Sequence, residues 1–329
     1  MIVLGIESSC DETAAAICRN GKILSSVVSS QLIHSKFGGV IPEIASREHE
    51  KLLNQLVHES LEESGIKKDE IDAIAVTVGP GLAGTLLTGI SFAKGLALGL
   101  DIPVLPVNHL EAHIFANFLA DPSLEYPFVC LLVSGGHTQL WLIEKMNHYT
   151  LLGETRDDAA GEAFDKGARI FGLSYPGGPL IEEEAKGGNP KAHHFPRGLM
   201  GKESLEFSFS GLKTSLLYFM DNFQESDSVK KRDIIASYQK AIIDTLVEKM
   251  KRAIQKTNVK TCVIAGGVAA NKSLRETLES SLPTIRILFP DLSYCTDNAA
   301  MISYLGELKA NAGESWSIDF GVKPNLKLA

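Results

Sequence analysis

The chain has few cysteines, and none of the five stands in a CxxC pair. Their scattered positions and odd number argue against a disulfide framework and are typical of reduced thiols in a cytosol. The N-terminus lacks a basic leader and reaches an acidic residue at Glu7, so we expect no secretory signal. The longest apolar runs, at 71–78 and 128–133, are too short to span a bilayer. We therefore predict a cytoplasmic protein with no membrane partner.

An excess of basic residues is also missing, since 32 Lys and Arg stand against 40 Asp and Glu and the net charge is −8. A protein that holds nucleic acid with its whole surface is normally basic. We interpret the local basic stretches at 230–232 and 249–256 first as solvated helix faces. If the substrate is a nucleic acid, we expect a partner protein to supply part of the positive surface. The P-loop pattern GxxxxGK[ST] is absent as well, which excludes that nucleotide-binding device.

Strands and helices alternate along the chain in two similar halves. LGIESSCDETAAAI and LLVSGGHTQLWLI both read as strand, Ser/Gly-rich turn and second strand. VTVGPGLAGTLLTG and VIAGGVAANKSLRE both read as strand, glycine turn and helix. This repeat predicts an α/β protein of two like domains across a cleft, where the turns and helix N-termini can hold phosphate. We place the boundary near 121–126 and expect an irregular stretch from 172 to 201.

The sharpest local signal is the pair His109 and His113 in HLEAH. Histidines four apart lie on one helix face and can share a metal ion, although two helix-surface histidines are the alternative. A metalloprotease needs HExxH, whereas Glu111 stands about 200° around the helix from the first histidine. Asp297 is a candidate third ligand or an ordinary helix N-cap, and the sequence leaves both open. Imidazole with carboxylate suits Zn or Fe(II).

Three glycine-rich turns are candidates for ligand binding. GPGLAG at 79–84 matches GxGxxG, but the next strand ends in Asn108 rather than in the acid that holds a ribose, which disfavours a dinucleotide site. SGGHT at 134–138 and AGGVAAN at 265–271 are better candidates, because glycine lets a ligand approach backbone N–H groups. Asn271 is either a helix N-cap alone or also a ligand for a ribose or base.

Several acidic residues are further candidates. Asp11 and Glu12 resemble the acidic phosphate-and-metal corner of actin-like ATPases, with a solvated tight turn as the alternative. Asp165 lies on a helix that we expect to face the cleft. Glu182 follows the YPGGP loop by one helical turn, and the loop's two glycines form either a plain chain reversal or a wall for a ribose.

Ten segments in this order resemble the Kae1/TsaD/Qri7 family, whose members were formerly called O-sialoglycoprotein endopeptidases. They are GIESSCDETAAAI, GGVIPEIASREH, VGPGLAGTLLTGISFAKGLA, NHLEAH, LLVSGGHT, GEAFDKGAR, YPGGP, FSFSGLKTS, AGGVAANKSLR and CTDNAAMI, running from residue 5 to residue 302. The opening SSCDET resembles the bacterial TsaD branch. The resemblance implies a duplicated two-lobed fold of the actin/Hsp70/sugar-kinase (ASKHA) type. We expect lobes at 1–123 and 124–329, with a family insertion around 175–235.

The resemblance also implies an activity: transfer of threonylcarbamoyl from threonylcarbamoyl-AMP to N6 of the adenosine 3′ to the anticodon in tRNAs reading ANN codons. One divalent ion per subunit, Fe(II) or Zn, would be held by His109, His113 and Asp297. The threonylcarbamoyl adenylate would be held by nine residues, which are Leu132, Val133, Ser134, Gly135, Gly136, Asp165, Gly178, Glu182 and Asn271. Glu182 stands where many relatives have Asp, so its carboxylate reaches one methylene further. Asp11 or Glu12 is our hypothesis for the base.

The partners implied are tRNA, a TsaB-like paralogue in a heterodimer and a TsaE-like ATPase, and a homodimer of the isolated chain is compatible with the resemblance. Three other classes compete. A small-molecule kinase or ATPase of the same superfold typically binds Mg²⁺ through carboxylates and nucleotide phosphates, which the histidine pair disfavours. The misplaced Glu111 disfavours a metalloprotease. A catalytically silent scaffold is disfavoured because both histidines are present.

Overall fold

The computed structural model describes residues 1–201, 203–225, 229–314 and 317–328. Its strands are β1 (Ile2–Glu7), β2 (Glu12–Arg19), β3 (Lys22–Ser30), β4 (Ala73–Gly79), β5 (Val104–Asn108), β6 (Phe128–Val133), β7 (Thr138–Lys145), β8 (His148–Glu154), β9 (Thr261–Ala265) and β10 (Arg286–Leu288). Its α-helices are α1 (Pro42–Ser64), α2 (Ala83–Leu100), α3 (His109–Ala120), α4 (Ala160–Ile170), α5 (Gly177–Glu184), α6 (Ser210–Met220), α7 (Lys231–Thr257), α8 (Lys272–Ser281), α9 (Leu292–Cys295) and α10 (Ala299–Asn311). Short 3₁₀ turns are η1 (Leu32–Phe37), η2 (Lys68–Glu70) and η3 (Gly267–Ala270).

Two five-stranded sheets share one topology. The first has the order β3-β2-β1-β4-β5 and the second the order β8-β7-β6-β9-β10. In each sheet the first three strands form an antiparallel meander. The central strand, β1 or β6, then pairs in parallel with β4 or β9, which in turn pairs in parallel with the edge strand, β5 or β10. The predicted duplication is therefore confirmed at the level of strand order and direction.

The strands are apolar and buried, as the sequence pattern predicts. Every residue of β4 and β6 is buried, which is typical of central strands covered on both faces. The helices begin and end at residues that favour those positions. Pro42 begins α1, where its missing N–H costs nothing, and Gly65 ends that helix with a left-handed φ of 66°.

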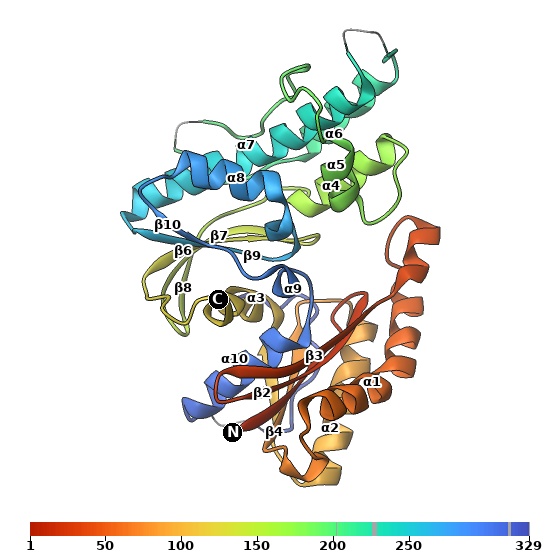
Figure 1. The fold of residues 1–329 in the computed structure, drawn as a ribbon, viewed down its shortest axis with the longest axis vertical. Coiled ribbons are helices and arrows are strands. Elements are labelled where there is room, and N and C mark those ends of the chain that lie inside the picture. The colour runs from red at the N-terminus through yellow and green to blue at the C-terminus, as the bar shows by residue number, and fades with distance from the viewer. Residues whose placement is uncertain (202, 226–228, 315–316, 329) are drawn as a thin grey trace. The chain divides into compact units, whose positions relative to one another are not determined.

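The described part of the chain divides into two compact units, one of residues 1–123 with those described in 290–328 and the other of those described in 124–289. The units change at 123/124, and the described residues of 290–328 pack in the first unit rather than with residues 124–289. The cause is α10, which lies against β1, β2 and α3 (Figure 1). Gly5 on β1 allows this approach, because a Cβ there would lie 2.5 Å from the carbonyl oxygen of Ala299.

Two predictions of secondary structure were incomplete. The stretch expected to be irregular contains α5, and α6 and α9 were not predicted. Their short, mixed-polarity sequences lack a long helical period, so packing rather than pattern determines them. Residues 202 and 226–228 of the predicted insertion, and 315–316 and 329 of the predicted second lobe, lie outside the described residues.

Among the described residues, α2 is the one helix long and apolar enough to cross a membrane by length and composition, with a mean hydropathy of 1.3 over 18 residues. Helices in the core of a soluble protein pass the same test, so a single instance is weak evidence. In this structure α2 packs against β4 and α1. Its buried side chains, among them Ile90 and Ala93, join the core of the first sheet.

Protein backbone fills the glycine turn after β4. A Cβ on Gly79 would lie 1.9 Å from the carbonyl oxygen of Lys323, and one on Gly81 would lie 2.6 Å from that of Ser9. The N–H of Gly81 donates to the Pro324 carbonyl at 3.1 Å. These glycines therefore admit the C-terminal segment of the chain, which is a packing role and argues further against a dinucleotide site.

Candidate metal centre and substrate-binding turns

The histidine pair lies on the first turns of α3, directly after β5. The Asn108 side chain caps this helix by accepting from the N–H groups of Leu110 and Glu111 at 2.9 and 3.3 Å. His109 is thereby fixed as the first helical residue. Both histidines are buried, with exposed fractions of 8% for His109 and 1% for His113. The two rings lie edge to face with centroids 4.6 Å apart. The Nε2 atoms of both rings contact the same neighbouring side chain.

That neighbour is Asp297. Its Oδ1 lies 3.4 Å from Nε2 of His109 and 3.1 Å from Nε2 of His113. Two atoms about 2.1 Å from one ion at the tetrahedral angle are about 3.4 Å apart, so these spacings, which are also those of hydrogen bonds, leave the three atoms close enough to share an ion. The three side chains form the group that could hold a metal among the described residues. Their donor chemistry, two imidazoles and a carboxylate, fits a divalent transition metal.

The two alternatives that the sequence left open at Asp297 are now separated. Asn298, one residue further on, is the N-cap of α10, because its side chain accepts from the N–H of Met301 at 3.0 Å. Asp297 is therefore not the cap. Glu111 lies away from the group, as expected, and pairs with Lys309 at 3.0 Å. This geometry removes the carboxylate that a metalloprotease would need beside its ion.

Opposite charges stabilise one another within the group. Burial opposes protonation of His109, but the Asp297 and Glu7 carboxylates raise its pKa well above the usual value. Burial would raise the pKa of Asp297, yet His109 and His113 hold it far below its ordinary range. Burial lowers the pKa of His113. A metal ligand must be a neutral imidazole, and the lowered pKa of His113 favours that form. At His109 the carboxylates of Asp297 and Glu7 favour a positive charge, which a bound cation would supply in place of the proton.

The acidic turn between β1 and β2 is held by the side chain of His49 and by the backbone N–H of Gln31. His49 on α1 lies 2.9 Å from the carbonyl oxygen of Cys10 through Nε2 and 2.8 Å from Thr13 Oγ1 through Nδ1. The N–H of Gln31 donates to the carbonyl of Asp11 at 3.0 Å. Burial, then the carboxylates of Asp297 and Asp11, raise the pKa of Glu12 to about 9. Of the two interpretations of this turn, the solvated tight turn does not fit, because Asp11 and Glu12 are half-buried and the charge of Asp297 acts on Glu12.

The pKa of Glu12 makes stability depend on pH in a definite direction. Between its ordinary value of 4.5 and about 9, the folded carboxyl holds a proton that the unfolded chain has released. Its contribution to the free energy of unfolding is therefore present below pH 4.5 and lost as pH rises through 9. Glu12→Gln, which imitates the protonated form, should gain at least about 1 kcal/mol on the wild type between about pH 5 and about pH 8. Urea unfolding of chelator-treated proteins measures this, and parallel pH profiles would contradict it.

In the second unit the two predicted glycine turns lie against each other. Ser134, Gly135 and Gly136 follow β6, and the N–H of His137 donates to Ser134 Oγ at 3.1 Å. Gly266 follows the neighbouring β9, and a Cβ there would lie 2.4 Å from the carbonyl oxygen of Val133. The N–H of Gly161, at the start of α4, donates to the Ser134 carbonyl at 3.1 Å. Because no side chain separates these segments, the turns and the helix start meet closely.

Room for a ligand is found at other glycines. A Cβ on Gly135, Gly136, Gly178 or Gly267 would meet no described atom within 4 Å. The side chains of Leu132 and Val133, by contrast, are fully buried in β6. Those two residues were predicted to hold substrate, and their position in the core leaves only backbone groups for that purpose.

The remaining predicted residues are linked by helix packing. Asp165 on α4 accepts from the N–H of Gly177 at 2.7 Å, which holds the start of α5 and with it Gly178. Glu182 on α5 accepts from the N–H of Lys272 at 2.7 Å, the first residue of α8. The structure therefore joins these residues to α8 within one unit.

Asn271 is the N-cap of α8, which was one of its two predicted roles. Its Oδ1 accepts from the N–H of Leu274 at 2.9 Å, and its Nδ2 donates to Gln239 at 3.1 Å. Both ends of the amide are therefore engaged with protein groups. A contact of this side chain with a ligand stays a prediction.

Sequence reasoning missed several residues that shape these sites. Glu7 and Thr77, which lie behind His109, are fully buried polar residues at the ends of adjacent strands. A charged residue at the end of an apolar strand run was the available signal for Glu7. Gly161 and Gly266 bring the turns together, and only the distances to neighbouring backbone reveal that role.

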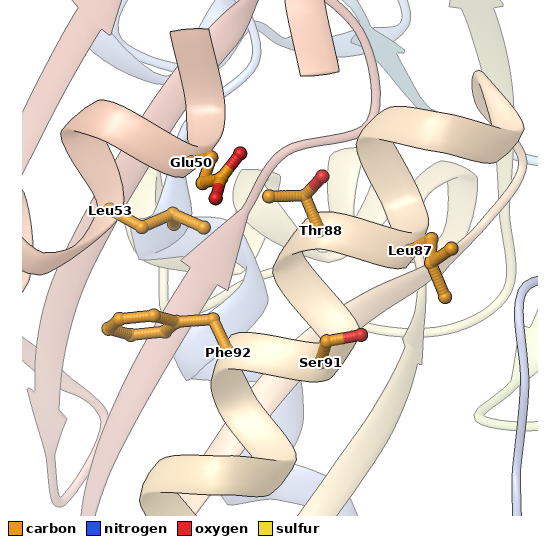
Figure 2. A pocket seen from close by; sticks show the side chains of 6 residues that line it. All are labelled: Glu50, Leu53, Leu87, Thr88, Ser91 and Phe92. Carbon is orange, nitrogen blue, oxygen red and sulfur yellow. The ribbon is translucent and has the colours of Figure 1, made fainter. Parts of the chain in front are cut away.

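A hollow of about 340 Å³ lies between α1 and α2 in the first unit (Figure 2). Its lining contains none of the predicted site residues. Figure 2 shows Glu50 and Leu53 from α1 facing Thr88 and Phe92 from α2. The lining side chains are mixed in polarity, with Glu50, Thr88 and Ser91 beside three apolar residues, and none of them belongs to the group that could hold a metal.

Comparison with known proteins gives a consistent result. A protein-family model described as TsaD: tRNA N6-adenosine threonylcarbamoyltransferase matches residues 22–304. A tRNA N6-adenosine threonylcarbamoyltransferase from Kosmotoga olearia is 52% identical over 331 residues, covering 100% of this chain and 99% of that protein. The protein of the same name from Thermosipho africanus is 51% identical and is covered over 100% of both chains.

Solved structures support the fold class. Component A of (R)-2-hydroxyglutaryl-CoA dehydratase from Acidaminococcus fermentans superposes with a TM-score of 0.57 at 17% identity, covering 94% of this chain and 99% of that one. At that identity the likeness concerns the fold alone, which is the duplicated α/β fold of the actin/Hsp70/sugar-kinase class. From the family match over residues 22–304 and relatives about half identical along the whole chain, this chain belongs to the TsaD family of tRNA N6-adenosine threonylcarbamoyltransferases.

Proposed function

We propose that this chain transfers the threonylcarbamoyl group from threonylcarbamoyl-AMP to N6 of the adenosine 3′-adjacent to the anticodon in tRNAs reading ANN codons. The observation that carries the proposal is the full-length match, at about half identity, to relatives that bear the transferase name. The five cysteines are all free thiols, which supports a cytoplasmic site of action.

We propose that His109, His113 and Asp297 hold one divalent ion, Fe(II) or Zn. Support comes from the donor set, from nitrogen-to-oxygen spacings of 3.1 and 3.4 Å, and from burial of both histidines. When bound, such an ion would supply Lewis-acid chemistry at this site. Imidazole and carboxylate ligands suit both metals, so loading the purified protein with each metal in turn would distinguish them.

For the adenylate we propose the glycine turns of the second unit. Gly135, Gly136 and Gly267 leave open space beside backbone N–H groups, which suits close approach of a phosphate. Asp165, Gly178, Glu182 and Asn271 are proposed to surround the rest of the ligand. Their links to α5 and α8 would hold these elements in place.

The reaction we propose is a single acyl transfer. The exocyclic N6 of adenine attacks the carbamoyl carbon, a C–N bond forms, and the C–O bond to the phosphate breaks. AMP leaves with that electron pair, and the N6 proton passes to a carboxylate. Asp11 and Glu12 are the candidates for this base, since they lie in the half-buried turn between β1 and β2. Without a cation Glu12 keeps its own proton below about pH 9, so its action as a base would require the positive charge of the bound ion to lower its pKa.

We also propose that the chain works with partners, a TsaB-like paralogue in a heterodimer and a TsaE-like ATPase; a homodimer is a form open to the isolated chain. The net charge of −8 supports a partner that contributes basic surface for tRNA.

The test is transfer of radiolabelled threonine from pre-made threonylcarbamoyl-AMP to unmodified ANN-reading tRNA. We expect label on the tRNA when both partners are present and much less without them. A tRNA reading other codons is the matched control. No label from this chain, while an established transferase is active in the same mixture, would contradict the proposal and favour a kinase-like or scaffold role.

A further inference from the structure

A fully buried carboxylate lies behind the metal group. Glu7 is the last residue of β1 and is 0% exposed. Its Oε2 lies 3.0 Å from Nδ1 of His109, on the opposite edge of the ring from the nitrogen that faces Asp297. Glu7 itself is outside the group that could bind the ion. The hydrogen bonds of Glu7 indicate how it acts on His109.

Both oxygens of Glu7 face hydrogen-bond donors. The N–H of Ser9 donates to Oε1 at 2.5 Å, and the Thr77 hydroxyl donates to Oε2 at 2.6 Å. Donors on both oxygens favour the ionised carboxylate, which can only accept. The Nδ1 of His109 must therefore carry its proton toward Oε2. Ser9 Oγ, 3.3 Å from the same nitrogen, is a more distant second acceptor.

This arrangement determines where His109 has its lone pair. In the neutral ring that a metal ligand requires, the proton on Nδ1 leaves the lone pair on Nε2, which lies 3.4 Å from Asp297 Oδ1. His113 differs, since within the described residues its buried Nδ1 has no hydrogen-bond partner. Glu7 thus fixes the orientation of the His109 ring through Nδ1, and the Thr77 hydroxyl fixes Glu7 through a hydrogen bond to Oε2.

We propose that Glu7 is a positioning residue for the metal centre, which keeps His109 in the Nδ1–H tautomer and strengthens Nε2 as a ligand. A carboxylate behind a metal-bound histidine fixes the ring and raises its basicity, and its loss typically weakens metal binding about 10- to 100-fold. The inference rests on the proposed metal site and adds a residue that does not touch the ion.

The experiment compares zinc affinity in Glu7→Gln and wild type, by competition with a chromophoric chelator at fixed pH. Glutamine keeps the shape but places an NH₂ group against Ser9 N–H or against the donors at the other oxygen. We expect zinc to bind about 10- to 100-fold more weakly to the variant. Thr77→Val, which keeps the shape of the threonine and removes its hydroxyl, should weaken binding in the same direction by a smaller factor.

The chain offers a matched control in Glu307→Gln. Glu307 is also buried, at 1% exposure, and accepts from the N–H groups of Asn20 and Gly21 and from the Cys18 thiol. Replacing Glu307 should lower folding stability and leave zinc affinity unchanged, because this residue lies on α10 and its hydrogen bonds go to the turn between β2 and β3.

The outcomes are separable. Unchanged affinity in both Glu7→Gln and Thr77→Val, or an equal loss in Glu307→Gln, overturns the positioning role while the metal site stands. If Glu7→Gln does not fold, Thr77→Val decides the matter alone. A wild type that binds no zinc or Fe(II) overturns the metal site and the inference together, and the transfer assay then tests the proposed function on its own.

Discussion

Replacing His109 and His113 together by alanine should reduce threonylcarbamoyl transfer more than about 1000-fold, because loss of a bound Lewis acid removes several kcal/mol of transition-state stabilisation. The two imidazoles lie 3.4 and 3.1 Å from Oδ1 of Asp297 and are two of the three side chains in the candidate metal group, so the double variant leaves only the Asp297 carboxylate as a ligand. The measurement is label on tRNA with both partners present, together with the metal content of each purified protein. We expect the double variant to contain little metal.

A control for this result is His58→Ala with His148→Ala. Both residues lie at exposed positions, on α1 and β8, and outside the group that could hold a metal. This variant should keep full transfer and full metal content. Equal label from the wild type and from the His109→Ala/His113→Ala variant would leave the transferase assignment and remove the metal from its mechanism.

The second large effect is expected at Gly266, where alanine should damage both stability and transfer. Its φ of +87° is unfavourable for any other residue, and an added Cβ would lie 2.4 Å from the Val133 carbonyl oxygen. Strain and overpacking together should lower the free energy of unfolding by about 3 kcal/mol or more. A shift of the turns by about 1 Å can cost about 100-fold in rate. Thermal unfolding and the transfer assay measure the two effects.

The neighbouring Gly267 provides the matched control. A Cβ at this position meets no described atom within 4 Å, so Gly267→Ala should leave thermal stability unchanged. If the adenylate approaches this turn as proposed, the same variant should raise the KM for threonylcarbamoyl-AMP. A Gly267→Ala protein as unstable as Gly266→Ala would contradict the packing argument for both positions.

The sequence alone determined the features that depend on neighbours along the chain. Apolar runs and their turns predicted the strands of both sheets, and the repeated strand-turn-helix segments predicted the duplication. The spacing of His109 and His113 placed both on one helix face because helical geometry is local. The same geometry turned Glu111 away, and its pairing with Lys309 agrees.

Only the tertiary structure decided what approaches these local features from far along the chain. Asp297 reaches His113 across 184 positions because α10 packs on β1, where Gly5 has no side chain. Asn298, one residue later, is the N-cap of α10, so the side chain of Asp297 does not cap that helix. Both outcomes depend on packing between distant segments, which no pattern of neighbouring residues encodes.

The same reason explains the residues behind the site and the glycine turn that resembled a nucleotide site. Glu7 meets His109 across 102 positions and Thr77 across 70, through the order of β1, β4 and β5 in the sheet. The backbone of Lys323 fills the turn at Gly79. A glycine pattern shows that something approaches the backbone closely, and the fold decides whether it is a ligand or the protein itself.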